Sequence, residues 1–549
     1  MKIIKKYFIF VFAFSILFVS YIPNIHEVSV SNILPPDRTM IAGEHSYTYD
    51  YNVYLSKIKQ GLEGRNSVID KYDNHPQEKG IFLVMTYLIA GKIGSIFNLT
   101  PALIYHFLRI FTGILWISTI IFLNIYFLKK ITLINLGVTL SLLTASFPVF
   151  YQFEGQTWVT FYMNWWTELD ILKRISFIPH DTINYIFIAI FTILLSQLDK
   201  NIKYFYLICV LLFFSVLVQP SGAILFLISW GLYNLIKYFW LKTLPNIQIA
   251  EKIKQTVVIF IAILIPLLYI NNVTNTYPWK SVMDFHTNNP FDFNVKDYIL
   301  ALGPIFVTGI IGGIIALIKK KQELLGLITW IVGVSIAIIL FKFFPYQSLR
   351  FIQTANHIPL TVLTAYLFSE LWKITGIQGR VIKFIIFIIF ITIIINGLTQ
   401  IYFSLKSQNQ FIDQRARATI PLVPYPPQVM YPLTDFYNGL KWLEQNSPRS
   451  SIVLSKITAG NYIPAYSGNF VYFGHIAETP FYNERTIKVD EFFSGNMSEK
   501  QAEEFLKAEN INYIFYGPQE KENNIKDIGK YFFLKPVYQS PLVIIYRFN

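Results

Sequence analysis

Long apolar blocks dominate this chain of 549 residues and restrict its fold more than any other feature. A hydrocarbon core about 30 Å thick is crossed by a helix of roughly 17 to 25 mostly apolar residues. Blocks of about this size occur at 5–23, 101–128, 131–150, 182–198, 203–219, 221–241, 255–272, 298–318, 324–343, 356–373 and 381–403. We therefore predict a polytopic α-helical membrane protein with about eleven transmembrane helices.

Composition agrees with this prediction, since only 14% of the residues are charged, where a soluble protein has about a quarter. The first block follows Lys2, Lys5 and Lys6, and no small-residue cleavage motif comes after it. We therefore expect an uncleaved anchor rather than a signal peptide. The one cysteine, Cys209, allows no disulfide and no cysteine-based metal site within a single chain.

The net charge of +13 is distributed in a way that argues against nucleic acid as a partner. Lysines and arginines gather at the N-terminus and then in every second connection between apolar blocks. The intervening loops near 151–181, 273–297 and 344–355 carry only Lys173, Arg174, Lys280, Lys296 and Arg350. This is the positive-inside asymmetry. It predicts a multi-pass protein of the plasma (inner) membrane, among membrane lipids, with its N-terminus cytoplasmic.

Five segments follow from this topology. We expect a first transmembrane anchor (1–23), a long outer loop with interfacial helices (24–100), a transmembrane helical body (101–403), a linker (404–432) and a soluble extracytoplasmic domain (433–549). The linker contains the proline-rich VPYPPQVMYP at 423–432. In the last segment, short β-rich runs such as INYIFYG alternate with helical patterns at 435–447 and 498–510, which predicts a small α/β domain. The second helical pattern opens with a Ser-x-x-Gln capping motif.

The long outer loop contains two predicted helices. In DYNVYLSKIKQG, apolar residues recur at Tyr51, Leu55, Ile58 and Leu62, which is helical spacing. The run at 81–99 is apolar but contains Gly91, Lys92 and Gly94. A full crossing there would invert the charge asymmetry, so we expect an amphipathic helix in the membrane interface.

The start of the same loop carries candidate catalytic carboxylates, in GEHSYTYDYN. Asp50 or Glu44 is suited to act as general base for an acceptor hydroxyl or amine. His45, Tyr49 and Tyr54 lie beside them and are candidate contacts for acceptor or donor. Asp50 also has a structural interpretation, as the N-cap of the helix predicted from Tyr51. Glu44 likewise suits a solvated loop residue.

Cations of the outer loops are candidate phosphate ligands. Lys173, Arg174 and His180 lie in NWWTELDILKRISFIPHD, and Arg350 and His357 lie in KFFPYQSLRFIQTANHIP. Each also has a structural interpretation, as an interfacial cation or a packed polar residue. His475, in the loop after NFVYFG, is a further candidate contact, although turn chemistry alone explains the glycine before it. No cofactor is assigned. A divalent metal is left open, because no ligand spacing fixes one.

Two stretches carry a family resemblance. YDYNVYLSKIKQGLEG resembles the first-loop region of GT-C glycosyltransferases, which include protein O-mannosyltransferases, aminoarabinose transferases and the catalytic subunit of oligosaccharyltransferase. SLRFIQTANHIPLTVLTAYLF is similar to a late span of these enzymes, in which a basic residue precedes a proline. The resemblance implies sugar transfer from a polyprenyl-phosphate donor on the non-cytoplasmic face. The catalytic acid would be Asp50, with Glu44 second, and Arg350 would face the phosphate. The family's frequent Asp-Glu pair is absent here, so the base remains open.

The predicted activity is therefore that of an inverting hexosyltransferase with a single carboxylate base. Arg350, Lys173, Arg174, His180 and His357 would bind the donor phosphate. The partners would be a lipid-linked sugar and an acceptor glycan, lipid or protein. The alternatives are a polysaccharide or lipid transporter or flippase, a ligase or polymerase of surface polysaccharide, and a GT-C-like scaffold without catalysis.

Overall fold

The computed structural model describes residues 2–75, 77, 79–153, 155–198, 201–245, 248–344, 347–417, 430–522 and 528–548. The chain forms two compact units. Unit 1 comprises Met1–Ile22, Arg109–Tyr269 and Pro290–Ser407, and unit 2 comprises Pro23–Leu108, Ile270–Asn289 and Gln408–Asn549. The long first loop and the C-terminal segment thus belong to the same unit.

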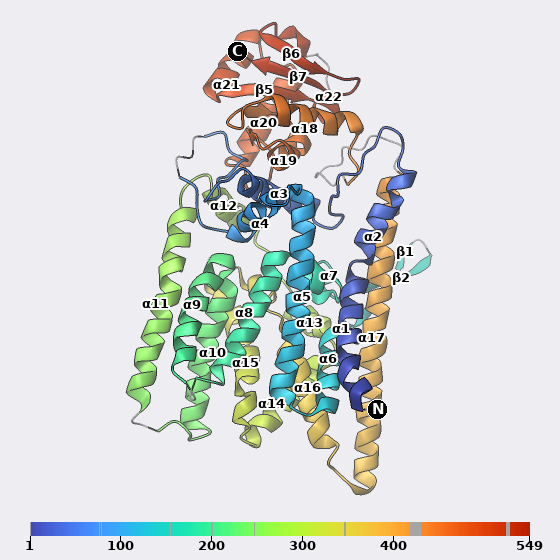
Figure 1. The fold of residues 1–549 in the computed structure, drawn as a ribbon, viewed down its shortest axis with the longest axis vertical. Coiled ribbons are helices and arrows are strands. Elements are labelled where there is room, and N and C mark those ends of the chain that lie inside the picture. Colours follow the sequence, from blue (N-terminus) through green and yellow to red (C-terminus); the bar gives the residue numbers. More distant parts are fainter. Residues whose placement is uncertain are drawn as a thin grey trace. The chain divides into compact units, whose positions relative to one another are not determined.

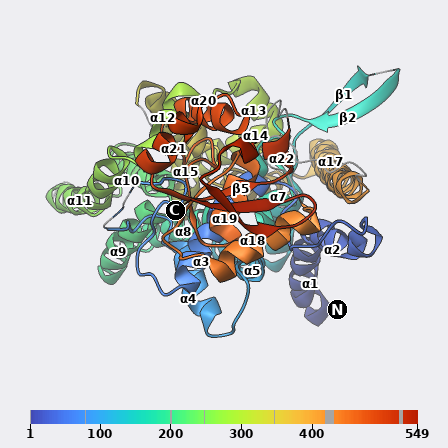
Figure 2. The same cartoon turned by 90° about the horizontal axis from the view of Figure 1, so that it is seen from above.

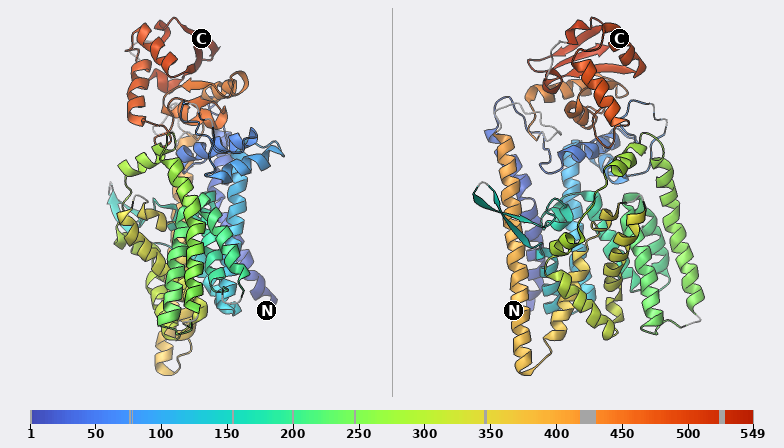
Figure 3. Two further views of the ribbon diagram at one scale, coloured as in Figure 1. Left: turned by 90° about the vertical axis from the view of Figure 1, so that its left-hand side faces the viewer. Right: turned by 180° about the vertical axis from the view of Figure 1, so that it is seen from behind.

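Apolar helices make up most of unit 1, and its long helices run side by side (Figure 3). The helices are α1 (Lys2–Ser20), α5 (Pro101–Leu128), α6 (Ile131–Leu143), α7 (Lys173–Ser176), α8 (Pro179–Leu195), α9 (Lys203–Val218), α10 (Pro220–Phe239), α11 (Ile249–Thr274), α13 (Val295–Leu302), α14 (Ile305–Ile318), α15 (Leu325–Leu340), α16 (His357–Leu371) and α17 (Gly376–Ala416). Short 3₁₀ turns are η2 (Thr167–Leu169), η4 (Gln322–Leu324), η5 (Phe341–Phe343) and η6 (Ser348–Phe351).

A helix lies at each of the predicted apolar blocks, which confirms the helical membrane body. Among the described residues, five helices are long and apolar enough to cross a membrane, or up to seven if each of two bent pairs is one span. The count of eleven crossings stays a prediction. Helices α11 and α17 bury only 22% of their apolar windows within the protein, as expected for helices that face lipid.

One predicted block is longer than the helix that it contains. The block at 131–150 holds α6, which ends at Leu143, and the chain continues into the antiparallel strands β1 (Pro148–Phe153) and β2 (Gln156–Phe161). This hairpin projects from the helices of unit 1 (Figure 2). Its side chains Phe150, Tyr151 and Trp158 are exposed. An apolar hairpin and the end of an apolar helix have the same composition, so hydropathy could not separate them.

Unit 2 holds the small α/β domain that the sequence predicts (Figure 1). Its helices are α2 (Ile22–Ser29), α3 (Thr48–Leu62), α4 (Met85–Ser95), α12 (Lys280–Asn288), α18 (Thr434–Asn446), α19 (Ile457–Tyr466), α20 (Tyr482–Phe493), α21 (Glu499–Ala508) and α22 (Pro518–Lys521), with 3₁₀ turns η1 (Val30–Ile33) and η7 (Ile528–Lys530). Its strands are β3 (Ile452–Leu454), β4 (Phe470–Val471), β5 (Ile511–Tyr516), β6 (Leu534–Gln539) and β7 (Ile544–Phe548), in the sheet order β4-β3-β5-β7-β6.

Both faces of this sheet are buried at its central strand β5, where successive side chains point to opposite faces. Tyr513 and Phe515 point into one hydrophobic cluster, while Ile514 and Tyr516 point into another. The first cluster also contains Val53 and Tyr72 of the long first loop. Part of that loop therefore packs in the hydrophobic core of the C-terminal sheet. The capping box predicted at Ser498 and Gln501 is present at the start of α21.

The helix predicted in the first loop exists, but it begins earlier than expected. Helix α3 starts at Thr48 with Tyr47 as its N-cap, so Asp50 lies inside the first turn and the N-cap interpretation is wrong. Tyr51, Leu55 and Ile58 are completely buried, as their spacing predicted.

The run at 81–99 forms α4, and its place in the membrane interface stays a prediction. Helix α4 packs closely against α3 at Gly61. A Cβ at this position would lie 2.1 Å from the carbonyl oxygen of Leu88, so only glycine fits there. In the predicted linker, α17 continues to Ala416. Residues 423–429 of its proline-rich stretch lie outside the described residues.

Candidate active site

Of the two candidate bases, Asp50 is the carboxylate that remains accessible. Its side chain is 44% exposed, and its Oδ1 lies 3.3 Å from Nε2 of His475. Nδ1 of His475 accepts the backbone N–H groups of Ala477 and Glu478, each at 3.1 Å. A nitrogen that accepts carries no proton, so we assign the proton of the neutral ring to Nε2, from which it is donated to Asp50. His475 therefore orients the carboxylate.

Tyr49 holds the His475 ring in place. The two rings stack with their centroids 4.0 Å apart, and the backbone N–H of Ile476 donates to the Tyr49 hydroxyl. Desolvation by burial raises the pKa of Tyr49 well above its usual value, so this hydroxyl stays protonated. The predicted contact residue Tyr49 is thus engaged with the loop of His475.

Close backbone packing fixes the loop that carries His475. Gly474 lies against Gly460 of α19, and a Cβ on Gly474 would be 2.4 Å from the Gly460 carbonyl oxygen. The Thr479 hydroxyl oxygen accepts the N–H groups of Gly474 and His475 at 3.2 and 3.0 Å. Gly474 is therefore required by close approach to a helix, and not by the turn chemistry that its sequence suggested.

A buried amide network ties α3 to α19 beneath Asp50. Asn52 donates to Oδ1 of Asn461 at 2.7 Å, and Asn461 donates to the Tyr49 carbonyl at 3.2 Å. The Tyr72 hydroxyl donates to the Asn461 carbonyl at 3.1 Å. Asn52 and Asn461 are completely buried. Buried hydrogen bonds of this kind favour one relative position for the two helices.

Glu44 and His45 are buried and face inward. Glu44 is 1% exposed. His45 Nδ1 lies 3.4 Å from its carboxylate and 3.2 Å from that of Glu27, while Nε2 lies 2.8 Å from Gln408. Burial opposes a charge on His45, but the Glu44 and Glu27 carboxylates outweigh it and raise the pKa of His45. Tyr54 is also packed, with its ring stacked 4.5 Å from that of Tyr87.

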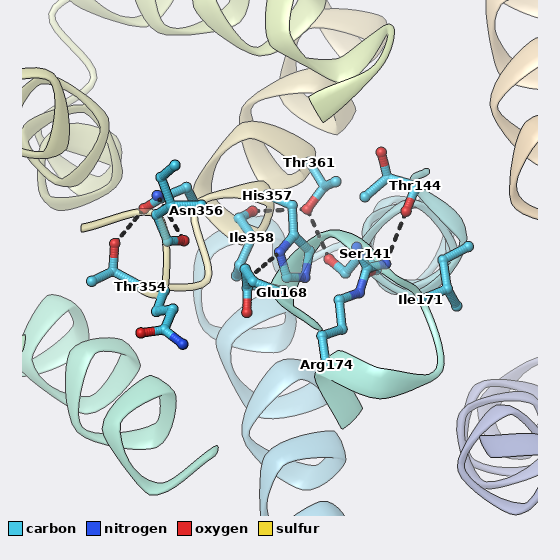
Figure 4. Close-up of polar contacts among 12 residues, drawn as sticks. Ser141, Thr144, Glu168, Ile171, Arg174, Thr354, Asn356, His357, Ile358 and Thr361 are labelled. Carbon is cyan, nitrogen blue, oxygen red and sulfur yellow. Dashed lines mark hydrogen bonds and ion pairs between the residues drawn. The ribbon is translucent and has the colours of Figure 1, made fainter. Parts of the chain in front are cut away.

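In unit 1, two predicted phosphate ligands lie in a buried polar cluster (Figure 4). His357 Nδ1 is 3.0 Å from Oε1 of Glu168, and both side chains are at most 5% exposed. Arg174 donates from Nη2 to the carbonyl oxygens of Ser141, Leu142 and Thr144, at 3.3, 3.3 and 2.9 Å. These contacts give Arg174 and His357 a role in holding α6, α7 and α16 together.

Two other predicted cations surround a second buried carboxylate, Asp181. His180 Nε2 lies 3.7 Å from its Oδ1. Arg350 donates to Gln353 at 3.2 Å, and Gln353 donates to Oδ2 of Asp181 at 3.3 Å. Arg350 and His180 are only half-buried, as is Lys173 on α7. These three cations are therefore more accessible than Arg174 and His357.

Sequence analysis missed three carboxylates of these clusters, namely Glu27, Glu168 and Asp181. A signal existed for two of them, because TELD and PHD place acids inside otherwise apolar or basic stretches. Among the residues that the structure describes, no three His, Cys, Asp or Glu side chains are grouped as metal ligands would be.

Comparison with known proteins shows a fold likeness at low sequence identity. No protein-family profile matches the chain, and no curated protein matches it in sequence. The archaeal oligosaccharyltransferase AglB from Archaeoglobus fulgidus, in complex with an inhibitory peptide and a dolichol-phosphate, is similar with a TM-score of 0.52 and 12% identity, over 93% of this chain and 69% of that one.

The Archaeoglobus fulgidus oligosaccharyltransferase tethered to an acceptor peptide gives a TM-score of 0.50 at 13% identity, over 100% of this chain and 75% of that one. The chain therefore shares the fold of these GT-C enzymes, as the resemblance of its first loop implied.

Proposed function

We propose that this chain is a membrane glycosyltransferase that moves a sugar from a polyprenyl-phosphate-linked donor to an acceptor hydroxyl or amine. The observation that carries the proposal is Asp50, a half-open carboxylate oriented by the Nε2–H of His475. The fold likeness supports it, since the similar oligosaccharyltransferase was solved with a dolichol-phosphate.

Asp50 acts as the general base in the proposed reaction. Its carboxylate takes the proton of the acceptor while the acceptor oxygen or nitrogen forms a bond to the anomeric carbon. The bond from that carbon to the phosphate oxygen breaks, and the polyprenyl phosphate leaves with the electron pair. Direct displacement inverts the anomeric carbon. The phosphate is a good leaving group without protonation, so one carboxylate suffices, whereas glycosidases use two.

The burial of Glu44 supports Asp50 as the base. Glu44 is 1% exposed and shares His45 with Glu27. A base must come within hydrogen-bond reach of the proton that it removes. Glu44 would have to leave its buried cluster to do so, whereas Asp50 is accessible where it stands.

Arg350, His180 and Lys173 are assigned to the donor phosphate. They are half-buried cations, and electrostatic stabilisation of departing negative charge is their expected contribution. Arg174 and His357 are assigned a positioning role, because their donors are directed at backbone carbonyls and at Glu168. The charge asymmetry of the connections supports an outer location for these loops and for the C-terminal domain.

Sugar transfer by the purified full-length chain in nanodiscs, with a panel of polyprenyl-phosphate hexoses, tests the proposal. We expect one donor to be used, and Arg350→Ala to raise its KM about 10- to 100-fold, as for loss of a charge-assisted hydrogen bond. Lys296→Ala, which removes an exposed cation of another outer loop, is the matched control and should have no effect. A folded chain that uses no donor but moves polyprenyl lipid between leaflets would instead be a flippase.

A further inference from the structure

A cavity of about 420 Å³ lies in unit 2 between α12 and the loop that follows His475. Binding sites for small molecules are typically about 300–1,000 Å³. A second cavity of about 410 Å³ shares Tyr277 and Phe481 with the first, so the two adjoin at these rings, and we call them together the groove. None of the functional assignments above uses this groove.

Two aromatic rings are presented in the groove. The ring centroids of Tyr277 and Phe481 are 4.6 Å apart, and the two residues are 42% and 48% exposed. Both rings therefore offer an exposed apolar face to a ligand.

Polar groups surround these rings. Asp284, Asn288, Asn289, Asn483 and Glu484 line the first cavity, and the Tyr277 hydroxyl donates to Asp284 at 2.7 Å. No lysine or arginine is among the described residues that line the first cavity, whereas Lys79 and His75 line the second and Lys280 lies over the Tyr277 ring, 5.3 Å from its centroid. Carboxylates and amides without lysine or arginine disfavour an anionic ligand such as a phosphate in the first cavity. They suit hydroxyl groups, which both donate and accept.

The groove shares a loop with the proposed base. Ile476 and Thr479 line the first cavity. Thr479 accepts the backbone N–H of His475, and the N–H of Ile476 donates to Tyr49. A ligand in the groove would therefore lie against the segment that orients Asp50.

We propose that this groove binds the acceptor, and that the acceptor is a neutral or amino saccharide. The acceptor role rests on the proposed glycosyltransferase activity. Flat aromatic faces match the apolar C–H face of a sugar ring, and the carboxylates and amides match its hydroxyl edge. A peptide would be expected to seek apolar pockets and backbone partners instead.

Saccharide binding to the full-length chain in nanodiscs tests the inference, measured by saturation-transfer NMR with disaccharides of mannose, glucose and N-acetylglucosamine. We expect one of them to bind, and Phe481→Ala to weaken it about tenfold, as for loss of an aromatic contact. Tyr277→Leu keeps apolar bulk but removes the ring face, so it should weaken binding similarly. Phe532→Ala, which removes an 85% exposed ring elsewhere in unit 2, should not.

A second readout separates this inference from the proposed function. Hydrolysis of the donor, in which water replaces the acceptor, should be unchanged in Phe481→Ala and Tyr277→Leu. Donor turnover without saccharide binding would overturn the groove assignment and leave the transferase intact. Saccharide binding without donor turnover would overturn the acceptor role. Binding of a Ser/Thr-rich hexapeptide that Phe481→Ala abolishes would overturn the saccharide class.

Discussion

Two carboxylate–histidine pairs, one from each unit of the molecule, contrast in exposure and in hydrogen bonding. Asp50 and His475 lie 3.3 Å apart with the acid 44% exposed, whereas Glu168 and His357 lie 3.0 Å apart with the acid 2% exposed. The second nitrogen of His475 accepts two backbone N–H groups, while Nε2 of His357 is buried with no hydrogen-bond partner among the described residues.

This difference is the basis for proposing a chemical role for one pair and a structural role for the other. A base needs an open face and a fixed orientation, and the loop around His475 supplies both to Asp50. The Glu168 pair has no open face. It joins segments that are far apart in the sequence, from η2 to α16. We therefore propose a catalytic role for the Asp–His pair of unit 2 and a packing role for the Glu–His pair of unit 1.

Glu168→Ala is expected to have the largest effect on stability. It leaves Nδ1 of His357 buried without its partner, which costs about 3 kcal/mol, near the upper end for a buried unsatisfied group. The measurement is the unfolding midpoint in nanodiscs, with the exposed Glu323→Ala as the control. An unchanged midpoint, together with lost transfer, would make Glu168 catalytic and erase the contrast with Asp50.

Gly474→Ala should destabilise unit 2 by about 2 kcal/mol, the usual cost of forcing an atom into a packed contact. The added Cβ would lie 2.4 Å from the Gly460 carbonyl, so the loop of His475 must shift. Gly231→Ala in α10 is the matched control, since nothing lies within 4 Å of its Cβ. Thermal unfolding compares the two, and equal midpoints would show that the close contact does not fix the loop.

His475→Ala should lower transfer about tenfold, roughly 1.4 kcal/mol, because Asp50 loses the donor that orients it. His475→Gln should restore most of the rate, since its amide nitrogen can replace Nε2–H. His475→Ala should also lower the unfolding midpoint, because it removes the ring that stacks on Tyr49 and accepts two backbone N–H groups, so the rates are compared at a temperature where both variants are folded. If His475→Gln does not restore the transfer rate and its pH–rate profile is shifted from that of the wild type, His475 itself transfers a proton.

Glu520, a buried carboxylate of unit 2 that accepts from backbone N–H groups, sharpens the comparison. Glu520 accepts the backbone N–H groups of Lys456 and Gly517, and burial still raises its pKa to about 7. The folded chain therefore holds this proton over a range in which the unfolded chain has lost it. Stability should fall as pH rises from the unfolded value of 4.5 to about 7, by at most about 1.4 kcal/mol per pH unit. Glu520→Gln should remove that slope, and an identical slope in both proteins would refute the assignment.

Local pattern predicted much of this fold. Helices lie at every apolar block, and the spacing of Tyr51, Leu55 and Ile58 gave the buried face of α3, because helix periodicity depends on near neighbours only. Strand β6 was not predicted, since four of its six residues are exposed and show no alternation.

The candidate site was harder to predict from the sequence than the helices were. The chain separates Asp50 from its partner His475 by 425 residues, and nothing local pairs them. Glu44 and Asp50 are six positions apart in one polar stretch, and either suited the role of base. Tertiary packing leaves Glu44 1% exposed beside His45, which itself contacts Glu27 and Gln408, whereas the Asp50 side chain stays 44% exposed.

The most direct test of the account is the single-turnover rate of sugar transfer by Asp50→Asn, measured beside Glu44→Gln and the wild type in the same nanodiscs. Asparagine keeps the oxygen that accepts from His475 and removes only the basicity. We predict a rate at least about a hundredfold lower in Asp50→Asn, within the range of about 10²–10⁴ for general-base catalysis, at an unchanged unfolding midpoint. A near wild-type rate in Asp50→Asn, with transfer abolished in Glu44→Gln, would contradict it and move the base to the buried carboxylate.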